Sequence, residues 1–212
     1  MSDRYQGIAE RFARETAEHT MTVRHDDGLY RHLRFQKPGS GSYWFDLITV
    51  PHALIFRGDG ESFVFDRLDD MFAFFRGPVG HISPSYWAEK LTSHRDATRT
   101  YSKDVFDQQV AADLADVEKD YPGVTKAWDE HVNGVLAEYN TEYEDGARAA
   151  LNDFEYLPEE VAGEPFRFQD TWEWELQDFH WWFLWALHGI VWGIAQYDAA
   201  KQAVETPAGV AQ

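Results

Sequence analysis

The chemical groups that stand out in this chain are carboxylates concentrated in its second half. Residues 1–103 hold 14 Asp and Glu and 14 Lys and Arg, whereas residues 104–212 hold 23 acids and five bases. The second half therefore accounts for the whole formal net charge of −18. A block of this sign repels nucleic acids and anionic membranes, and it attracts basic surfaces, including those of proteins that grip phosphate groups. The charge favours a binding function over catalysis.

The segment Lys103–Asp120 shows how these acids would be presented to a partner. Its apolar residues recur at helical spacing from Phe106 to Tyr121 and predict one buried stripe, with acidic side chains on both flanks. We expect the following residues to form an acidic partner-binding face: Asp104, Asp107, Asp113, Asp116, Asp120, Glu130, Glu138, Glu142, Glu144 and Asp145. One interpretation of this face is imitation of the phosphate backbone of a nucleic acid. The other is a solvated helical surface whose acidity only keeps the protein soluble.

Residue types suited to catalysis are present, but they follow no motif that names a reaction. A catalytic pocket would have to assemble from side chains that are distant in the sequence: His25, Asp26, His52, Asp59, His180 and His188. The loop Gly58–Glu61 lacks the Gly-Lys-Ser/Thr of a phosphate-binding loop and predicts a hairpin turn. The chain contains no cysteine, and its histidine spacings match no metal site. We therefore assign no catalytic residue, metal or cofactor.

The predicted last helix, about residues 178–200, places aromatic side chains in one tight stripe. The stripe consists of Trp181, Trp185, His188 and Trp192, and Gly189 and Gly193 lie beside it. It predicts either a ligand-stacking or dimer face, or the central helix of the core. Residues 179–197 carry no formal charge and approach the length of a membrane span. Two His, a Gln, acidic neighbours at both ends and the lack of flanking Lys or Arg favour a buried helix instead.

Apolar periodicity and turn signals predict an α+β fold. A helix over residues 4–18 precedes an antiparallel sheet of about four or five strands within residues 21–66, with turns at His25-Asp26-Asp27-Gly28 and Gly58-Asp59-Gly60. Further helices are predicted over 68–75, with Asp66 as its cap, and over 85–91, 103–120, 125–139 and 143–154. We expect a single domain over residues 1–212, with a sheet-containing scaffold half (1–100), an acidic helical half (101–200) and a disordered tail (204–212). The N-terminus carries charges where a signal peptide needs an apolar stretch, so we expect a cytoplasmic protein.

Three segments carry a resemblance: YWFDLITVPHALIFRGDGESFVFDRLDDMFAFFR (43–76), ISPSYWAEKL (82–91) and DFHWWFLWALHGIVWGIAQYDA (178–199). Together they resemble a family of short proteins encoded by tailed phages and prophages, over about residues 30–200. The resemblance implies a phage or prophage origin. It implies no particular activity and no catalytic residue.

From the charge and this resemblance we expect a phage-encoded, non-enzymatic inhibitor of a host defence complex, of the anti-CRISPR or DNA-mimic kind, acting in the bacterial host cytoplasm. Its partner would be a host nucleic-acid-binding protein with a basic surface, rather than a nucleic acid or a membrane. The alternative is a phage enzyme that acts on a nucleotide or a defence signalling molecule in a cleft between sheet and helices. Basic residues near the first hairpin (Arg24, Arg31, Arg34 and Lys37) could also meet the acidic half of another copy, which would produce a homo-oligomer.

Overall fold

The computed structural model describes residues 5–93, 95–134 and 137–205. The chain forms two compact units. Unit 1 comprises the chain up to Thr98 and from Phe179 onward, and unit 2 comprises Arg99–Asp178. An antiparallel sheet and most of the helices occupy separate stretches of the chain, which confirms the predicted α+β class.

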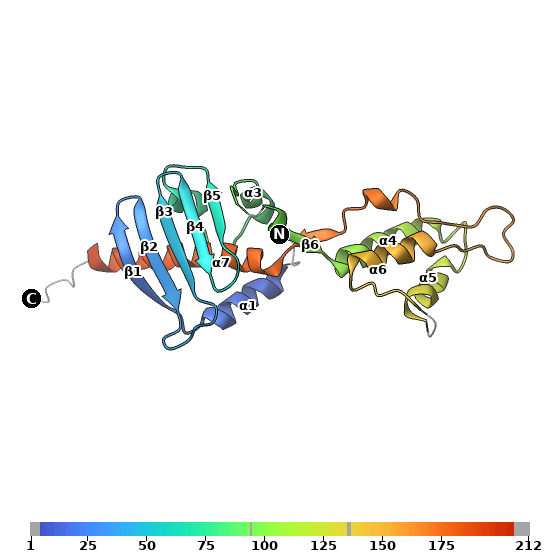
Figure 1. Ribbon diagram of the computed structural model, residues 1–212, viewed down its shortest axis with the longest axis horizontal. Helices are drawn as coiled ribbons and strands as arrows, with labels where there is room; N and C mark the ends of the chain where they lie inside the picture. The colour runs from blue at the N-terminus through green and yellow to red at the C-terminus, as the bar shows by residue number, and fades with distance from the viewer. Residues whose placement is uncertain (1–4, 94, 135–136, 206–212) are drawn as a thin grey trace, which may run out of the picture. The chain divides into compact units, whose positions relative to one another are not determined.

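The sheet of unit 1 is a five-stranded antiparallel meander, as predicted for residues 21–66 (Figure 1). Its strands are β1 (Thr20–Asp27), β2 (Tyr30–Gln36), β3 (Phe45–Val50), β4 (Ala53–Gly58) and β5 (Phe63–Asp66). Gly28 occupies the tight turn between β1 and β2 with a φ of 60°, which glycine adopts without strain. His25 and Asp26, expected in this turn, lie within β1 instead.

One face of the sheet consists of large apolar side chains that are fully buried. The strand register places Phe35 opposite Phe45, and it places Leu47 between Leu33 and Phe56. The rings of Phe35 and Phe45 stack with their centroids 4.8 Å apart, and those of Phe45 and Phe56 with their centroids 5.3 Å apart. Because successive side chains point to opposite faces of a strand, this layer accounts for the alternating pattern of the sequence.

Helix α7 (Trp181–Glu205) lies on this apolar face of the sheet (Figure 1). Two of its glycines approach the sheet so closely that a side chain there would require the neighbouring side chains to move. A Cβ atom at Gly189 would lie 3.1 Å from the ring of Phe56, and one at Gly193 would lie 2.7 Å from Leu47 and 3.1 Å from Phe35. The sheet of the same chain, rather than a second copy, therefore occupies the glycine face.

Two shorter helices, α1 (Gln6–Thr16) and α2 (Met71–Phe75), pack against α7. Helix α2 begins at Met71 because the side chain of Asp70 accepts a hydrogen bond from the backbone N–H of Phe72 at 3.0 Å. The predicted helix start at residue 68 and the predicted cap at Asp66 are therefore wrong. Asp66 is instead the last residue of β5.

The outer edge of β5 is covered by the chain that follows α3 (Pro84–Ala88). The backbone N–H of Asp66 donates to the carbonyl of Lys90 at 2.9 Å, and that of Thr92 donates to the carbonyl of Val64 at 2.8 Å. A short 3₁₀ helix, η2 (Arg95–Thr98), then ends the first part of unit 1. These bonds satisfy backbone groups that an open edge would leave unpaired.

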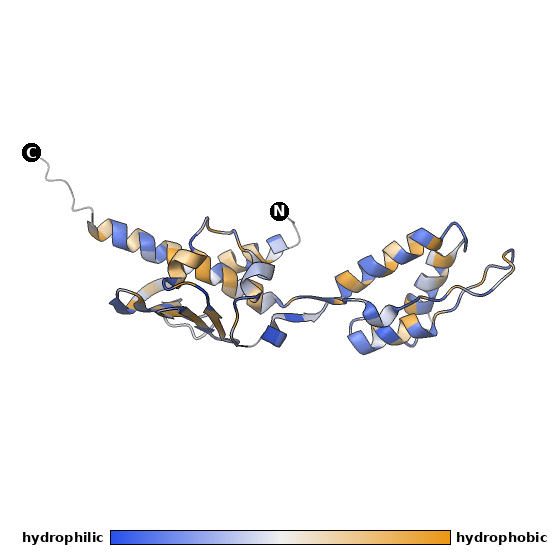
Figure 2. Ribbon diagram, turned by 90° about the horizontal axis from the view of Figure 1, so that it is seen from above, coloured by the Kyte–Doolittle hydropathy of each residue, from blue (hydrophilic) through white to orange (hydrophobic). Residues whose placement is uncertain are grey.

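Unit 2 is mainly helical and has its own apolar core. It contains β6 (Arg99–Tyr101), α4 (Lys103–Val117), α5 (Val124–Asn133), α6 (Glu144–Asp153), η3 (Thr171–Glu173) and most of β7 (Gln177–Phe179), which pairs with β6. Phe106, Val110 and Leu114 of α4 are buried as the sequence predicted, in a core shared with Trp128 of α5. In Figure 2 these helices alternate hydrophilic and hydrophobic residues along their length, as expected for helices with one buried stripe.

The last helix belongs to the same unit as the sheet, whereas the sequence grouped it with the acidic helices. Residues from 179 onward belong to unit 1, whose core includes Trp185, Ile190 and Ile194 of α7. Within the described ranges, no helix combines the length and the apolar character that crossing a membrane requires. Val204 and Glu205 still belong to α7, so the predicted tail starts too early, and its residues 206–212 lie outside the described residues.

The opposite face of the sheet carries a buried carboxylate surrounded by bases. Asp46 on β3 has no exposed side-chain surface and lies directly between Arg34 on β2 and Arg57 on β4. Arg34 Nη2 donates to Asp46 Oδ2 at 2.9 Å, Arg57 Nη2 lies 3.0 Å from the same oxygen, and His32 Nε2 lies 3.3 Å from it. Burial raises the pKa of Asp46, but the hydrogen bonds and the charge of Arg34, followed by a smaller effect of His32, outweigh it, so that the pKa lies below its ordinary value.

We expect Gly193→Leu to destabilise the protein by about 3 kcal/mol, because the new side chain must displace Leu47 and Phe35 from a filled core. Gly7→Ala on α1 is the control, since nothing lies within 4 Å of a Cβ atom there. It should leave stability unchanged or raise it by up to about 1 kcal/mol. Urea unfolding followed by circular dichroism measures both variants, and equal stabilities would contradict the close approach of α7 to the sheet.

We expect Asp46→Ala to cost about 2–3 kcal/mol at neutral pH, because it leaves two guanidinium groups without their shared carboxylate. The pKa of Asp46 is lower in the folded than in the unfolded protein. Its contribution to stability is therefore complete above the ordinary value of 3.8 and is lost as the pH falls through the folded value. Urea unfolding at a series of pH values should show wild type and variant converging in acid. Asp66→Ala, at an exposed strand end, should have little effect at any pH.

Candidate functional site

The acidic residues of unit 2 form the first candidate site. Arg99–Asp178 contains 21 Asp and Glu but only six Lys and Arg, so unit 2 carries a formal charge of −15 out of the total of −18. Six basic side chains can neutralise at most six of these carboxylates. The excess negative charge of the second half is therefore concentrated in one compact unit.

The ten acids predicted as a partner-binding face are distributed over three helices and a loop of unit 2. Five lie on or just after α4, one lies on α5, two lie in the loop before α6, and two lie in the first turn of α6. All are exposed except Asp113 and Glu144, which are half-buried. They form an acidic surface that spans several elements rather than one face of one helix.

Three of the predicted acids come together around Tyr101, which precedes α4. Burial, followed by the charges of Asp107, Glu142 and Glu144, raises the pKa of Tyr101 to about 12. The Tyr101 hydroxyl donates a hydrogen bond to the carbonyl of Thr141 at 2.7 Å. Carboxylates from two helices and a loop therefore add to the effect of burial on the pKa of Tyr101.

Acids of the unit also line two hollows. Glu130 and Glu138 border a hollow of about 310 Å³ together with Tyr139. Asp107 and Asp129 border a groove of about 280 Å³ between α4 and α5. Carboxylates at the rim of a hollow can meet a basic side chain that enters it, and the field of neighbouring acids strengthens the attraction.

Part of this acidity is neutralised locally. The ion pairs among the described residues of unit 2 include Lys103–Asp107, Lys126–Glu130, Arg148–Glu144 and Arg167–Glu155. Exposed pairs of this kind contribute little to stability. They use four of the six basic residues of the unit and involve three of the ten predicted acids, so most of the acidic surface keeps its charge.

Glu118, which lies beside the predicted acids at the end of α4, has a structural role instead. Its carboxylate accepts hydrogen bonds from the backbone N–H groups of Gly123 at 2.7 Å and Thr125 at 3.1 Å, and from the Thr125 hydroxyl at 2.6 Å. These bonds hold the pKa of Glu118 below its ordinary value, with the Thr125 hydroxyl as the largest cause. The carboxylate thereby joins the end of α4 to the start of α5.

The six candidate catalytic side chains are not gathered into one site. Their positions are β1 (His25, Asp26), the β3–β4 turn (His52), the β4–β5 turn (Asp59), the residue before α7 (His180) and α7 itself (His188). Asp26 accepts a hydrogen bond from the Tyr197 hydroxyl at 2.8 Å and pairs with Lys201. Burial raises the pKa of Asp26, but these two partners outweigh it and lower the pKa overall. Among the described residues, no three His, Asp or Glu are arranged to hold a metal ion.

The aromatic stripe of α7 faces α1 and belongs mainly to the core. Trp185 is fully buried, and its indole N–H donates to the carboxylate of Glu15 on α1 at 2.9 Å. The ring of Phe12 meets Trp185 edge-on with the centroids 5.0 Å apart, and it meets Trp192 in the same way at 5.9 Å. Trp182 stacks on Trp185 with an interplanar angle of 7°. The core interpretation of this stripe therefore accounts for most of its residues.

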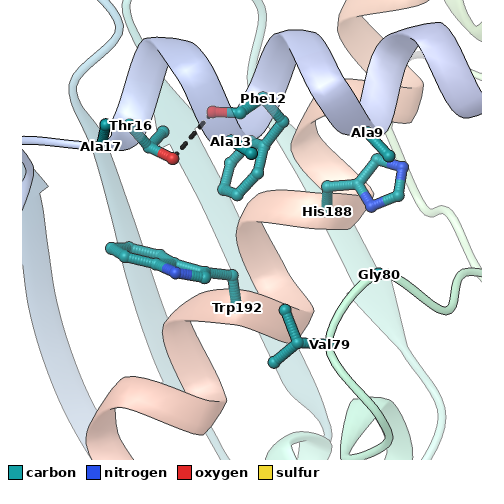
Figure 3. A pocket seen from close by; sticks show the side chains of 9 residues that line it. All are labelled: Ala9, Phe12, Ala13, Thr16, Ala17, Val79, Gly80, His188 and Trp192. Atoms are coloured by element: carbon teal, nitrogen blue, oxygen red, sulfur yellow. Dashed lines mark hydrogen bonds between the residues drawn. The ribbon is translucent and has the colours of Figure 1, made fainter.

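A pocket of about 360 Å³ remains beside the stripe, within unit 1 (Figure 3). It is lined by Ala9, Phe12, Ala13, Thr16 and Ala17 of α1, by Val79 and Gly80 of the loop after α2, and by His188 and Trp192 of α7. The three alanines recur at every fourth residue, so α1 presents small side chains along one wall of the pocket. Thr16, His188 and the indole N–H of Trp192 supply the polar side-chain groups of its lining, and none of them is charged at neutral pH.

His188 is the most unusual group in this wall. Its side chain belongs to a residue that is 4% exposed, and its Nε2 atom has no hydrogen-bond partner. Burial lowers the pKa of His188 to about 4, because an imidazolium ion would lose its hydration there. A buried polar atom without a partner costs about 1–3 kcal/mol. Four further side-chain nitrogens of the described residues, among them Nδ1 of His19 and Nδ1 of His180, are also buried without a partner, so this property alone does not indicate a function.

Sequence reasoning singled out His188 and Trp192 but missed the pocket. The spacing of Ala9, Ala13 and Ala17 was a signal that could have indicated a shallow trough along the first helix. Val79 and Gly80 carried no such signal, because a loop of the chain brings them to α7. A pocket built from three separate segments becomes visible only in the folded protein.

We expect the stability difference between wild type and His188→Leu to depend on pH. The pKa of His188 falls from 6.5 in the unfolded chain to about 4 in the folded protein, so the unfolded state binds more protons between these values. Wild-type stability should therefore fall, relative to the variant, by up to about 1.4 kcal/mol per pH unit as the pH drops from 6.5 towards 4. Urea unfolding across this range measures the difference. A constant difference would contradict burial of a neutral histidine, and His25→Leu, at an exposed position, controls for the loss of a histidine.

Comparisons with protein-family models, with curated proteins and with solved structures found no significant match for this chain. No family activity or ligand can therefore be transferred to it. Two features of its own residues indicate function: the acidic surface of unit 2 and the pocket beside His188 in unit 1.

Proposed function

We propose that this protein is a non-enzymatic binding protein whose unit 2 occupies a basic, nucleic-acid-binding surface of another protein. The observation that carries this proposal is the charge of −15 within Arg99–Asp178. Such a unit repels nucleic acids and is attracted to surfaces that evolved to hold phosphate groups. It would act by exclusion, since the acidic unit and a nucleic acid cannot occupy the same basic surface together.

The charge density of DNA explains why several elements of unit 2 have to contribute acids if the unit imitates a nucleic acid. Duplex DNA presents one negative charge per about 1.7 Å of its axis. The five predicted acids between Asp104 and Asp120 span about 24 Å at the helical rise of 1.5 Å per residue, or roughly one charge per 5 Å. Helix α4 alone is therefore a weaker mimic than DNA. Glu138, Glu142 and Asp145 on the neighbouring loop and helix supply additional charge.

Exposed aromatic side chains on unit 2 would supply affinity that charge alone does not. Trp172 is 75% exposed and Tyr143 is 69% exposed. The 3₁₀ turn that carries Trp172 is held to α6 by Arg148, whose guanidinium donates to the carbonyls of Thr171 at 3.0 Å and Trp174 at 3.4 Å. Large aromatic residues on a fixed backbone are typical binding hot spots, whereas surface charges mainly set association rate and specificity.

The partner class follows from the charge and from the resemblance to phage proteins. We propose a host defence complex that holds DNA or RNA, of the kind that anti-CRISPR proteins and DNA mimics inhibit. The host cytoplasm would be the place of action. Nucleic acid itself is disfavoured as a ligand by the net charge of −18.

The test is capture of a nucleic-acid-binding partner from nuclease-treated bacterial lysate, followed by elution with duplex DNA. We expect binding to be lost between about 0.05 M and about 0.5 M salt, because salt screens exposed charges. A charge-reduced variant then tests the surface. It carries amides at Asp113, Asp116, Asp120, Glu138 and Glu142. Five exposed ion pairs lost at about 0.3–1 kcal/mol each should weaken the affinity at least about tenfold.

A matched control variant carries amides at five carboxylates of unit 1: Glu10, Asp27, Glu61, Asp66 and Asp96. Both variants have a net charge of −13. Each set also includes one carboxylate that accepts a hydrogen bond from a Gln four residues earlier in its helix. The control should bind like the wild type. Equal binding by the two variants would contradict a specific role of the acids of unit 2: if both bind like the wild type these acids do not contribute to binding, and if both bind weakly only the net charge matters.

A further inference from the structure

The groove between α4 and α5, wholly within unit 2, offers an accessible apolar wall to an incoming side chain. In its lining, Ala111 of α4 is exposed, Val132 of α5 is half-buried, and Trp128 of α5 is 8% exposed. The groove volume of about 280 Å³ lies below the range of about 300–1,000 Å³ that small-molecule sites occupy. The groove therefore suits a single side chain of a partner better than a drug-sized molecule.

The rim of the groove carries one carboxylate that already holds a cation and one that does not. Lys103 Nζ lies 2.8 Å from one oxygen of Asp107 on α4 and 2.6 Å from the other. Asp129 on α5 is exposed and accepts a hydrogen bond from the neutral amide of Asn133 at 2.9 Å. Within the described part of the chain, Asp129 forms no ion pair. Asp129 is therefore the rim carboxylate that a cation from outside can reach.

The charge of unit 2 and the construction of the groove favour the same kind of side chain. The formal charge of −15 attracts a cation. An apolar wall beside a carboxylate suits a long aliphatic stem with a charged end, which lysine and arginine both have. Arginine fits this wall better, because its planar guanidinium is weakly hydrated, stacks on aromatic rings and pairs with a carboxylate through two N–H groups.

We propose that this groove receives an arginine side chain of the basic partner. The methylene groups lie against Ala111 and Val132, and the guanidinium contacts Trp128 and pairs with Asp129. This inference rests on the proposed function and names the group of the partner that unit 2 captures. Arginines of nucleic-acid-binding proteins hold phosphate oxygens, so an arginine seated in the groove is withdrawn from the phosphate backbone.

Three small probes test the groove on the full-length chain at about 0.05 M salt. They are the N-acetyl, N-methylamide derivatives of arginine, lysine and citrulline, and citrulline has the shape of arginine without its charge. ¹⁵N NMR titrations should place the shifts caused by the arginine probe on residues 107–111 and 128–133 and on the indole N–H of Trp128. The arginine probe should bind about tenfold more tightly than the citrulline probe, the value of a hydrogen bond between charged groups. It should bind about threefold more tightly than the lysine probe, which lacks the planar fork.

Two pairs of variants separate the groove from the general charge of the unit. Asp129→Asn should lower the affinity for the arginine probe about tenfold. Asp116→Asn, which removes the same charge at an exposed position of α4 outside the groove, should bind like the wild type. Ala111→Leu should fill the groove and abolish binding, whereas Ala112→Leu, at the adjacent exposed position outside it, should not. Leucine is a good helix former, so both leucine variants should fold.

Three results would overturn the proposal. They are shifts confined to another part of the protein, equal affinities for the arginine and citrulline probes, and unchanged binding of the arginine probe by Ala111→Leu and Asp129→Asn.

Capture of the partner from lysate separates this proposal from the proposed function. If the charge-reduced variant of unit 2 loses the partner while Ala111→Leu keeps it, the groove is not the docking point, although the acidic surface is. If the arginine probe binds in the groove but the wild type captures no nucleic-acid-binding partner, the groove stands as an arginine site and the proposed function fails.

Discussion

The contact between α7 and the apolar face of the sheet is the constraint on which the rest of unit 1 depends. Helix α7 can approach the sheet this closely because Gly189 and Gly193 have no side chains to separate it from Phe35, Leu47 and Phe56. Its opposite side then presents tryptophans that need a cover, and α1 supplies it through Phe12 and Glu15. The cover is incomplete, because three alanines of α1 lie where bulkier residues would fill the space. The pocket therefore results from the incomplete covering of α7 by α1.

Because α7 completes unit 1 but comes last in the sequence, it also determines how the negative charge is distributed along the chain. Unit 2 is inserted between Thr98 and Phe179, so the helix that completes the core of unit 1 comes after the acidic residues in the sequence. The predicted division of the chain at residue 100 therefore placed α7 in the same half as the acidic residues, although α7 belongs to unit 1. Residues 179–212 contribute only Asp198, Glu205 and Lys201 to the formal charge, and Asp198 accepts hydrogen bonds from Arg76. The asymmetry between halves of the sequence is in physical terms a property of the inserted unit.

Local sequence signals were enough to predict most of the helices and strands, but they predicted few of the contacts between these elements. The Asp-Gly turn and the alternating strands predicted the meander, and the spacing of Phe106, Val110 and Leu114 predicted the buried side of α4. These patterns arise within a few residues of one another. The bases around Asp46 depend on strand register, and the capping of α5 by Glu118 depends on how one helix follows another. The ten acids lie at exposed or half-buried positions, and their distribution over three helices and a loop could be seen only in the fold.

The two candidate sites also bear on the alternative of an enzyme that acts on a nucleotide. Such an enzyme needs cationic or backbone N–H groups that hold phosphates. The walls of the pocket beside His188 carry no charged side chain, and the six candidate catalytic residues lie on separate elements. The acidic unit adds a field that repels phosphate groups. A basic partner on unit 2 is compatible with these charges, and salt separates the two contributions to its binding. Screening weakens attraction between exposed charges, whereas burial of an aliphatic side chain against the apolar wall of the groove is almost insensitive to it.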